Sequence, residues 1–170
     1  MITLKPLEPN DVFGFYSWIK NPKAIKYSLS LFQNLSSSEQ IDVWYQSVLD
    51  DVKTFNLGIY INSNQCVGYA GITNISNTNK SGEFFIFIGD EVAWGKGIGT
   101  EVTRQITALG FNKLNLNRIM LTVSEPNIGA VKAYEKAGFK HEGRLRESCY
   151  RDGAYHDKLI MSILSSEFKF

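Results

Sequence analysis

Cysteine and histidine are scarce in this sequence. Cys66 and Cys149 are the only cysteines and form no CxxC pair, and His141 and His156 are too far apart for a local zinc motif. We therefore expect neither a disulfide framework nor a bound metal. The N-terminal residues MITLKPLEPND lack the apolar segment of a secretory signal, and no run approaches the ~18 apolar residues of a membrane-spanning helix. A soluble cytoplasmic protein without a membrane partner is the default expectation.

An excess of charge of one sign is also absent. The 18 basic and 17 acidic side chains leave a formal net charge of +1 at pH 7. A chain so close to neutral has no overall field that attracts nucleic acid or an anionic surface, so neither is expected as a partner. Its 170 residues, 44% of them hydrophobic, suffice for one buried core. We expect one domain over residues 1–170, without linker or repeat.

The first half of the chain carries strand and helix patterns separated by polar turns. Ser36 and Glu39 have the spacing of a capping box, and Ile41, Trp44 and Tyr45 begin an apolar pattern of helical period after them. This pattern indicates a helix through about residue 49. The other expected elements are a strand at 2–5, a helix at 12–19, hairpin strands at 54–61 and 66–73, and a polar loop at 74–82.

From Glu83 onward, strands and helices alternate. The run EFFIFIG is apolar after its first residue, as in a central strand, and a glycine-rich loop and a helix to about residue 114 follow it. The sequence therefore predicts a mixed α/β domain. The remaining expected elements are a strand at 118–123, a helix at 127–137 that Gly138 ends, and strands at 140–150 and 155–164 around a turn at Asp152 and Gly153.

The loop WGKGIGT has three glycines, Gly95, Gly97 and Gly99, between a buried strand and the start of a helix. Backbone N–H groups in such a loop can converge on a phosphate, and the helix dipole adds positive potential. The sequence lacks a Walker loop. It also fails to complete the GxGxxG dinucleotide fingerprint, because Thr100 or Val102 stands in the last place. A phosphate-containing ligand is indicated, and a small dinucleotide-binding enzyme remains a minor alternative.

Two stretches of the chain resemble the GNAT superfamily of N-acetyltransferases. The superfamily's central motif, Gln or Arg followed by two residues, Gly, one residue, and Gly or Ala, falls on Trp94, Gly97 and Gly99, with Trp94 departing from it. The second stretch, VSEPNIGAVKAYEKAGFKHEG, is similar to the family's strand, Asn, and helix bearing a Tyr near Lys and Gly-Phe. An aromatic residue before GKG is typical of the branch that acetylates ribosomal-protein N-termini, spermidine and amino sugars.

The resemblance implies a fold and a co-substrate. The fold is a central, mostly antiparallel seven-stranded sheet flanked by about four helices, in which the Glu83 strand and the Arg118 strand splay apart. Acetyl-CoA would lie between these two strands, without a metal. The residues implied to contact it are Phe87, Ile88, Trp94, Gly95, Lys96, Gly97, Ile98, Gly99, Thr100, Asn127, Ala130 and Lys136.

Acetyl transfer to an amine needs a base and an acid. A free alkylamine has a pKa of about 10, so it must lose a proton before it attacks. Glu83 begins its strand and is the only ionisable residue there before Asp90, which makes it the candidate base. Tyr134 matches the family's acid for the departing thiolate, and a phenol can protonate a thiolate at an expense of only about 2 kcal/mol. Backbone N–H groups near Phe87 and Ile88 are expected to stabilise the oxyanion.

The expected acceptor is a primary amine on a small molecule or a peptide, such as a nucleotide-linked amino sugar or a protein N-terminus. A polyamine is the less favoured acceptor. No acidic residue occurs between Asp11 and Glu39, whereas Lys20, Lys23 and Lys26 are basic. Two further questions stay open: whether the chain is instead a non-catalytic CoA- or nucleotide-binding regulatory module, and whether it forms a homodimer.

Overall fold

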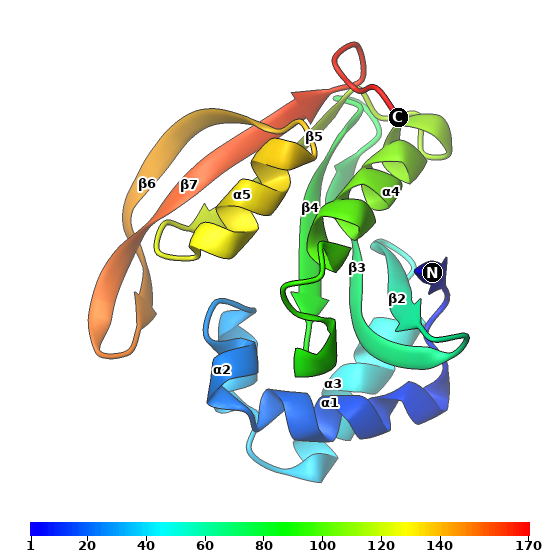
Figure 1. Ribbon diagram of the computed structural model, residues 1–170, viewed down its shortest axis with the longest axis vertical. Coiled ribbons are helices and arrows are strands. Elements are labelled where there is room, and N and C mark those ends of the chain that lie inside the picture. Colours follow the sequence, from blue (N-terminus) through cyan, green and yellow to red (C-terminus); the bar gives the residue numbers. More distant parts are fainter.

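Seven strands form one sheet in the computed structural model, which describes residues 1–170 (Figure 1). Their order across the sheet is β1-β2-β3-β4-β5-β7-β6, and all neighbours are antiparallel except β4 and β5. The strands are β1 (Thr3–Lys5), β2 (Phe55–Ile61), β3 (Gln65–Ser76), β4 (Ser81–Ile88), β5 (Arg118–Ser124), β6 (Lys140–Arg151) and β7 (Ala154–Leu164).

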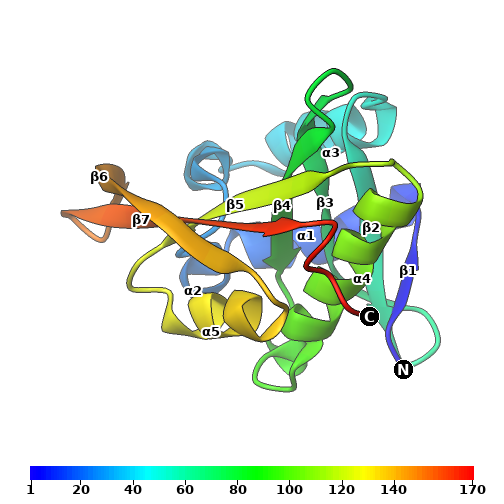
Figure 2. The same ribbon diagram turned by 90° about the horizontal axis from the view of Figure 1, so that it is seen from above.

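Five helices flank this sheet: α1 (Val12–Ile19), α2 (Pro22–Ile25), α3 (Ser38–Asp50), α4 (Ile98–Asn112) and α5 (Ile128–Lys136). Figure 2 shows α4 and α5 together on one face and α3 on the other. Side chains alternate between the faces along a strand, so Phe84 of β4 packs into the core beneath α4 and α5 while Phe87 packs among the aromatic rings of α1 and α3. None of the helices is long and apolar enough to cross a membrane.

Strands β4 and β5 pair only where they begin. The parallel pairing joins Ser81–Glu83 to Arg118–Met120, and beyond it the strands diverge. Because a strand normally pairs along its whole length, the divergence leaves a gap in the middle of the sheet. The mixed, mostly antiparallel seven-stranded sheet with a splayed central pair is therefore confirmed.

The segment expected as a loop at 74–82 is instead the end of one strand, a tight turn and the start of the next. Strand β3 continues to Ser76, which pairs with Ser81 of β4. Asn74 has φ +49° where the register shifts, so a bulge lets the strand continue past a residue with turn chemistry. The prediction was wrong because polar composition was taken to mean loop, whereas this end of the hairpin is polar and paired.

The capping box of α3 lies one residue later than expected. Ser37 accepts a hydrogen bond from the Gln40 N–H at 3.2 Å, and the Gln40 side chain accepts one from the Ser37 N–H at 3.3 Å. Ser36 with Glu39 and Ser37 with Gln40 have the same spacing, so the motif alone could not separate them.

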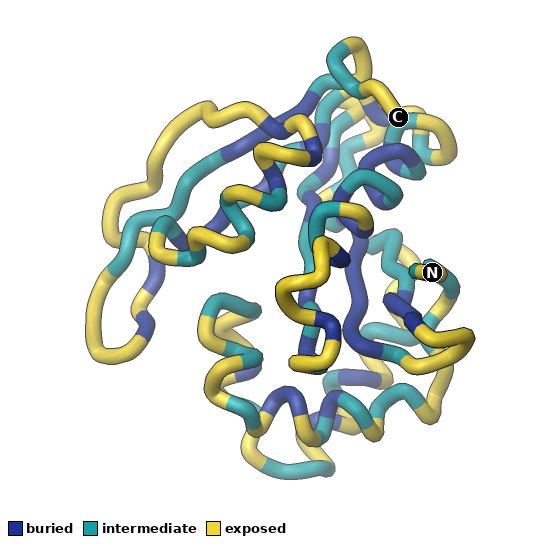
Figure 3. Tube along the Cα trace, viewed as in Figure 1, coloured by how far each residue is buried: buried dark blue, intermediate teal, exposed yellow.

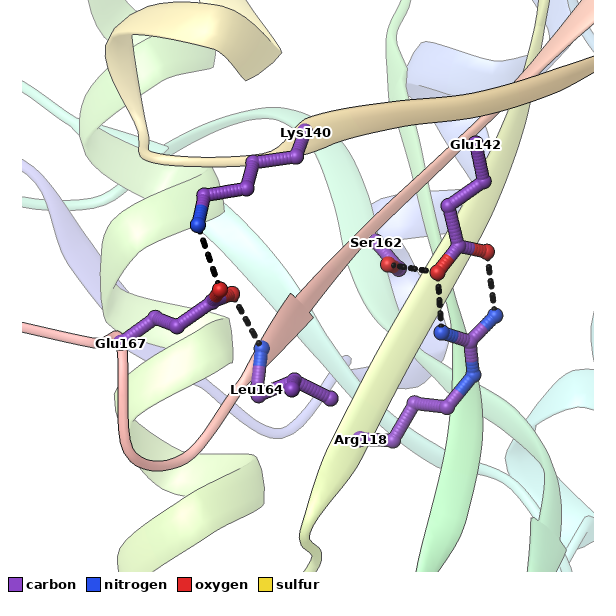
Figure 4. Close-up of polar contacts among 6 residues, drawn as sticks. All are labelled: Arg118, Lys140, Glu142, Ser162, Leu164 and Glu167. Carbon is purple, nitrogen blue, oxygen red and sulfur yellow. Dashed lines mark hydrogen bonds and ion pairs between the residues drawn. The ribbon is translucent and has the colours of Figure 1, made fainter.

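An ion pair joins β5 to β6 across β7 (Figure 4). Arg118 donates two hydrogen bonds to the carboxylate of Glu142, at 2.5 and 2.6 Å, and the Ser162 hydroxyl donates a third at 2.5 Å. These hydrogen bonds lower the pKa of Glu142 from 4.5 to about 2. A second pair, between Lys140 and Glu167, ties the C-terminal turn to β6 at 2.5 Å.

The Glu142 pair should make stability depend on pH. A carboxylate whose pKa is depressed in the folded state stabilises it above pH 4.5, and this stabilisation is lost as the pH falls toward 2. We expect Glu142→Gln to destabilise the protein by about 1 kcal/mol at pH 7, less than the pKa shift alone suggests, because solvent screens a partly exposed pair. Denaturant unfolding at several pH values measures this, and the difference from wild type should vanish near pH 2. Glu147→Gln on the same strand is the control, and an equal loss there would contradict the assignment.

Candidate active site

A cleft of about 680 Å³ lies between α2, the end of β4, the glycine loop and α5. It lies on the open side of the β4–β5 divergence. Every residue expected to contact acetyl-CoA lines this cleft except Lys96, which is exposed beside it. Tyr134, the candidate acid, lines it as well. Residues that are up to 49 positions apart in the sequence, from Phe87 to Lys136, are thus brought around one cavity.

The glycine loop has the geometry of a phosphate cradle. Gly95 and Gly97 have φ values of +71° and +76°, and a Cβ at either position would have no protein atom within 4 Å. The positive φ explains glycine there, and the open space leaves room for a ligand against the backbone. Gly97 is the N-cap of α4 and provides no side-chain cap, so the first N–H groups of this 15-residue helix can bind an anion. The loop therefore fits the pyrophosphate of CoA.

Trp94 fastens the glycine loop to the end of β4. Its indole Nε1 donates a hydrogen bond to the Ile88 carbonyl at 2.9 Å, while 37% of the residue remains exposed. The tryptophan that replaces the motif's Gln or Arg thus contacts the strand as well as lining the cleft.

The free backbone groups of β4 belong to Ile86 and Ile88, not to Phe87. The Gly89 N–H donates to Val67 on β3 at 2.9 Å. Because backbone groups alternate in direction along a strand, those of Phe87 also face β3, and those of Ile86 and Ile88 face the gap. Of the two N–H groups expected to stabilise the oxyanion, that of Ile88 faces the gap, whereas that of Phe87 faces β3 and Ile86 takes its place. Phe87 still lines the cleft, although its backbone groups do not face the gap.

Tyr134 of α5 presents a buried phenol to the cleft. The residue is 9% exposed, and its ring packs edge-on against Phe84 with 5.9 Å between centroids. Burial raises the pKa of this phenol above its ordinary value of 10. Tyr134 is therefore fully protonated at neutral pH, which is the state required of a proton donor.

Glu83 lies on the other face of the sheet. It is half-buried at the closed end of the β4–β5 pair, beside Met120, and is not part of the cleft lining. Its position two residues before Phe85 puts it on the face that carries α1 and α3. The Asn74 amide donates to its carboxylate at 2.9 Å, and no cation pairs with it. Glu83 and Tyr134 thus belong to opposite faces of the sheet, on either side of the β4–β5 gap.

Asn127 combines two roles at the start of α5. Its side-chain oxygen accepts a hydrogen bond from the Ala130 N–H at 3.3 Å, as an N-cap does, and the residue also lines the cleft. Both the structural and the ligand-binding interpretations of this residue agree with the geometry.

Sequence reasoning missed several residues of the cleft wall. Lys132 lines it one helical turn before Lys136, a spacing that could have identified it. On the α2 side of the cleft, which runs from Lys23 to Ser28, the charge of Lys23 was expected near the acceptor, but only the fold brings α2 opposite α5. The charged residues of the lining are three lysines, Lys23, Lys132 and Lys136, with no carboxylate, which suits a ligand carrying phosphates. No group of three or more His, Cys, Asp or Glu side chains that could hold a metal gathers in the structure.

Comparison with known proteins agrees with this geometry. Residues 1–140 match the family model of the acetyltransferase (GNAT) domain. Spermidine N(1)-acetyltransferase of Vibrio cholerae is 28% identical over 98% of this chain and 95% of its own length. YdaF of Bacillus subtilis, provisionally named a ribosomal N-acetyltransferase, is 28% identical over 99% of this chain and 93% of its own.

A solved structure extends the agreement to three dimensions. The crystal structure of spermidine N-acetyltransferase from Vibrio cholerae with CoA and spermine superimposes with a TM-score of 0.87 at 27% identity, covering 98% of this chain and 96% of that one. These matches favour an enzyme over a non-catalytic module and over a dinucleotide-binding protein. The chain therefore belongs to the GNAT family of acetyl-CoA-dependent N-acetyltransferases.

Proposed function

We propose that this enzyme acetylates a primary amine with two residues that act from opposite faces of the sheet. Tyr134 donates a proton to the departing CoA thiolate, and Glu83 accepts a proton, through water, from the amine. The observation that carries this proposal is the β4–β5 gap, which has a protonated phenol on the α5 face and, at its closed end on the other face, a carboxylate that no cation pairs with. An amine can then attack from one side while the thiol leaves on the other.

Backbone of the splayed strand would supply the remaining stabilisation. The N–H groups of Ile86 and Ile88 point into the gap, where no neighbouring strand pairs with them. A fixed N–H donor aimed at developing negative charge contributes about 2.7–4 kcal/mol in other acyl-transfer enzymes. The Trp94 indole donates a hydrogen bond to the carbonyl of Ile88, and the N–H of Ile88 remains free.

The charge around α2 favours an acceptor that is neutral or anionic apart from its amine. Lys20 and Lys23 lie next to and within α2, and no acidic residue occurs between Asp11 and Glu39. A polycation brought close to these lysines is repelled, whereas a nucleotide-linked amino sugar or a peptide N-terminus brings at most one positive charge to the reacting end.

A polyamine is the second candidate acceptor. It is favoured by the two spermidine acetyltransferases of Vibrio cholerae and Escherichia coli, which match 98% of this chain at 28% and 24% identity. The two candidates differ in the charge that the acceptor site must tolerate.

An acceptor panel distinguishes the two candidates. Thiol release from acetyl-CoA is followed with spermidine, a nucleotide-linked amino sugar and short peptides with free N-termini. We expect kcat/KM for spermidine to be at least about tenfold below that of the best acceptor, because two or more extra charges approach the lysines. The ratio of the two kcat/KM values should decrease in high salt, because salt screens this repulsion. Spermidine as the best acceptor would replace the first candidate by the second, and no turnover with any amine would remove both.

A further inference from the structure

Arg151 is a buried cation without a counter-ion. It ends β6 at the tip of the β6–β7 hairpin and is 7% exposed, although almost all of β6 is exposed (Figure 3). No carboxylate lies within ion-pair distance of its guanidinium. Burial of an unpaired charge is unfavourable unless hydrogen bonds replace the lost water, so the contacts of this side chain must be extensive.

The guanidinium binds a segment that lies more than 120 residues earlier in the chain. Its Nε donates to the Lys26 carbonyl at 3.1 Å, and its Nη2 donates to the Ser28 carbonyl at 3.0 Å and to the Ser30 hydroxyl at 3.3 Å. Its Nη1 donates to the Tyr150 carbonyl at 2.9 Å, and this hydrogen bond fixes the orientation of the guanidinium. A guanidinium spreads its donors over three nitrogens in one rigid plane, whereas the donors of an ammonium group share a single nitrogen and cannot span the same set of acceptors.

Two further contacts fasten the same segment. Lys26 forms an ion pair with Asp152, the residue after Arg151, at 3.5 Å. The Tyr27 hydroxyl donates to the Pro126 carbonyl at 3.5 Å, immediately before the Asn127 cap of α5. The segment after α2 therefore joins the hairpin tip on one side and the loop before α5 on the other.

This segment forms part of the cleft wall. Tyr27 and Ser28 line the cleft, opposite Ala130 and Tyr134 of α5. Locally the segment has little to hold it, because α2 contains only four residues and ends at Ile25. A helix so short is not stable by itself, so its position depends on tertiary contacts.

We propose that Arg151 is a positioning residue for acetyl-CoA binding. By fixing the carbonyls of Lys26 and Ser28, it holds the Tyr27–Ser28 wall at the distance from α5 that the co-substrate requires. The affinity for CoA thus depends on the tip of a hairpin that does not itself line the cleft.

The test compares Arg151→Ala and Arg151→Lys with Arg146→Ala, a control on the same strand whose exposed side chain makes no hydrogen bond or ion pair. Calorimetry, at temperatures below the unfolding transition, gives the Kd for CoA. Steady-state assays at a saturating amine concentration give the KM for acetyl-CoA and kcat. If the wall is correctly placed only a tenth of the time without Arg151, the Kd for CoA and the KM for acetyl-CoA rise about tenfold in Arg151→Ala. Both constants of Arg151→Lys should lie between those of wild type and those of Arg151→Ala. In both variants kcat at saturation should stay within about twofold of wild type.

Chemical rescue separates positioning from general destabilisation. Ethylguanidinium added to Arg151→Ala should restore part of the CoA affinity and should leave Arg146→Ala unchanged. A CoA affinity within twofold of Arg146→Ala would overturn the proposal, whatever happens to Tm. If Arg151→Ala does not fold, Arg151→Lys is judged by the same criterion.

Discussion

Tyr134→Phe should lower kcat by about 100-fold while the Kd for CoA stays within about twofold of wild type, because a positioned general acid contributes 10²- to 10⁴-fold. The phenol lines the cleft and burial keeps it protonated, so it can donate to the departing thiolate. Phenylalanine retains the ring that packs on Phe84 and Phe139 and removes only the hydroxyl. Steady-state thiol release measures kcat, and calorimetry with CoA measures binding.

Two comparisons make this result specific. Tyr155→Phe removes a hydroxyl from a tyrosine of β7 that is 66% exposed and outside the cleft, and it should change neither constant. Because the pKa of Tyr134 is raised, its titration should not appear in a pH–rate profile between pH 6 and 9. A Tyr134→Phe enzyme with more than half of the wild-type kcat would assign thiolate protonation to solvent.

Gly97→Ala should weaken CoA binding by about 100-fold, which corresponds to roughly 2.7 kcal/mol. The added Cβ enters the space above the loop, where no protein atom lies within 4 Å, and it stands where the pyrophosphate would approach the first N–H groups of α4. The positive φ of +76° adds backbone strain of about 1–2 kcal/mol. Calorimetry with CoA gives the affinity, and thermal unfolding without ligand gives the strain.

Gly153→Ala is the matched control for Gly97→Ala. Gly153 lies in the turn between β6 and β7 with φ +75°, and a Cβ there also meets no atom within 4 Å. The two variants should therefore lose similar stability, and only Gly97→Ala should lose CoA affinity. Equal affinities in the two variants would show that the phosphates bind elsewhere than over Gly97.

The parts of this protein that sequence could predict are those with local signals. The run from Glu83 through the glycine loop to α4 carries an apolar strand, a set of glycines and a helical period, each readable within about ten residues. The turn at Asp152 and Gly153 is equally local, and both residues have positive φ. The candidate site could be predicted because most of its residues belong to these segments.

What sequence could not supply depends on register and on distant contacts. A shift of one residue in strand register decides whether Ile86 or Phe87 turns its backbone groups toward the gap. An unbroken apolar run has no alternation of polar and apolar residues, so it does not reveal this register. Arg151 looks like any basic residue of a polar hairpin, and its partners at Lys26 and Ser28 are 125 and 123 positions away. Tyr27 enters the site for the same reason, through a contact with Pro126 that is 99 positions distant.

The splayed pair also places two open strand edges inside a sheet. Unpaired edges are the usual starting points of strand addition between molecules, and proteins normally confine them to the rim, where charge or a bulge blocks them. Here Phe84–Ile88 of β4 and Leu121–Ser124 of β5 lack a partner across the gap, and the Trp94 indole donates to the Ile88 carbonyl at the open end. The same tryptophan that fastens the glycine loop therefore satisfies one carbonyl of this internal edge within the chain itself.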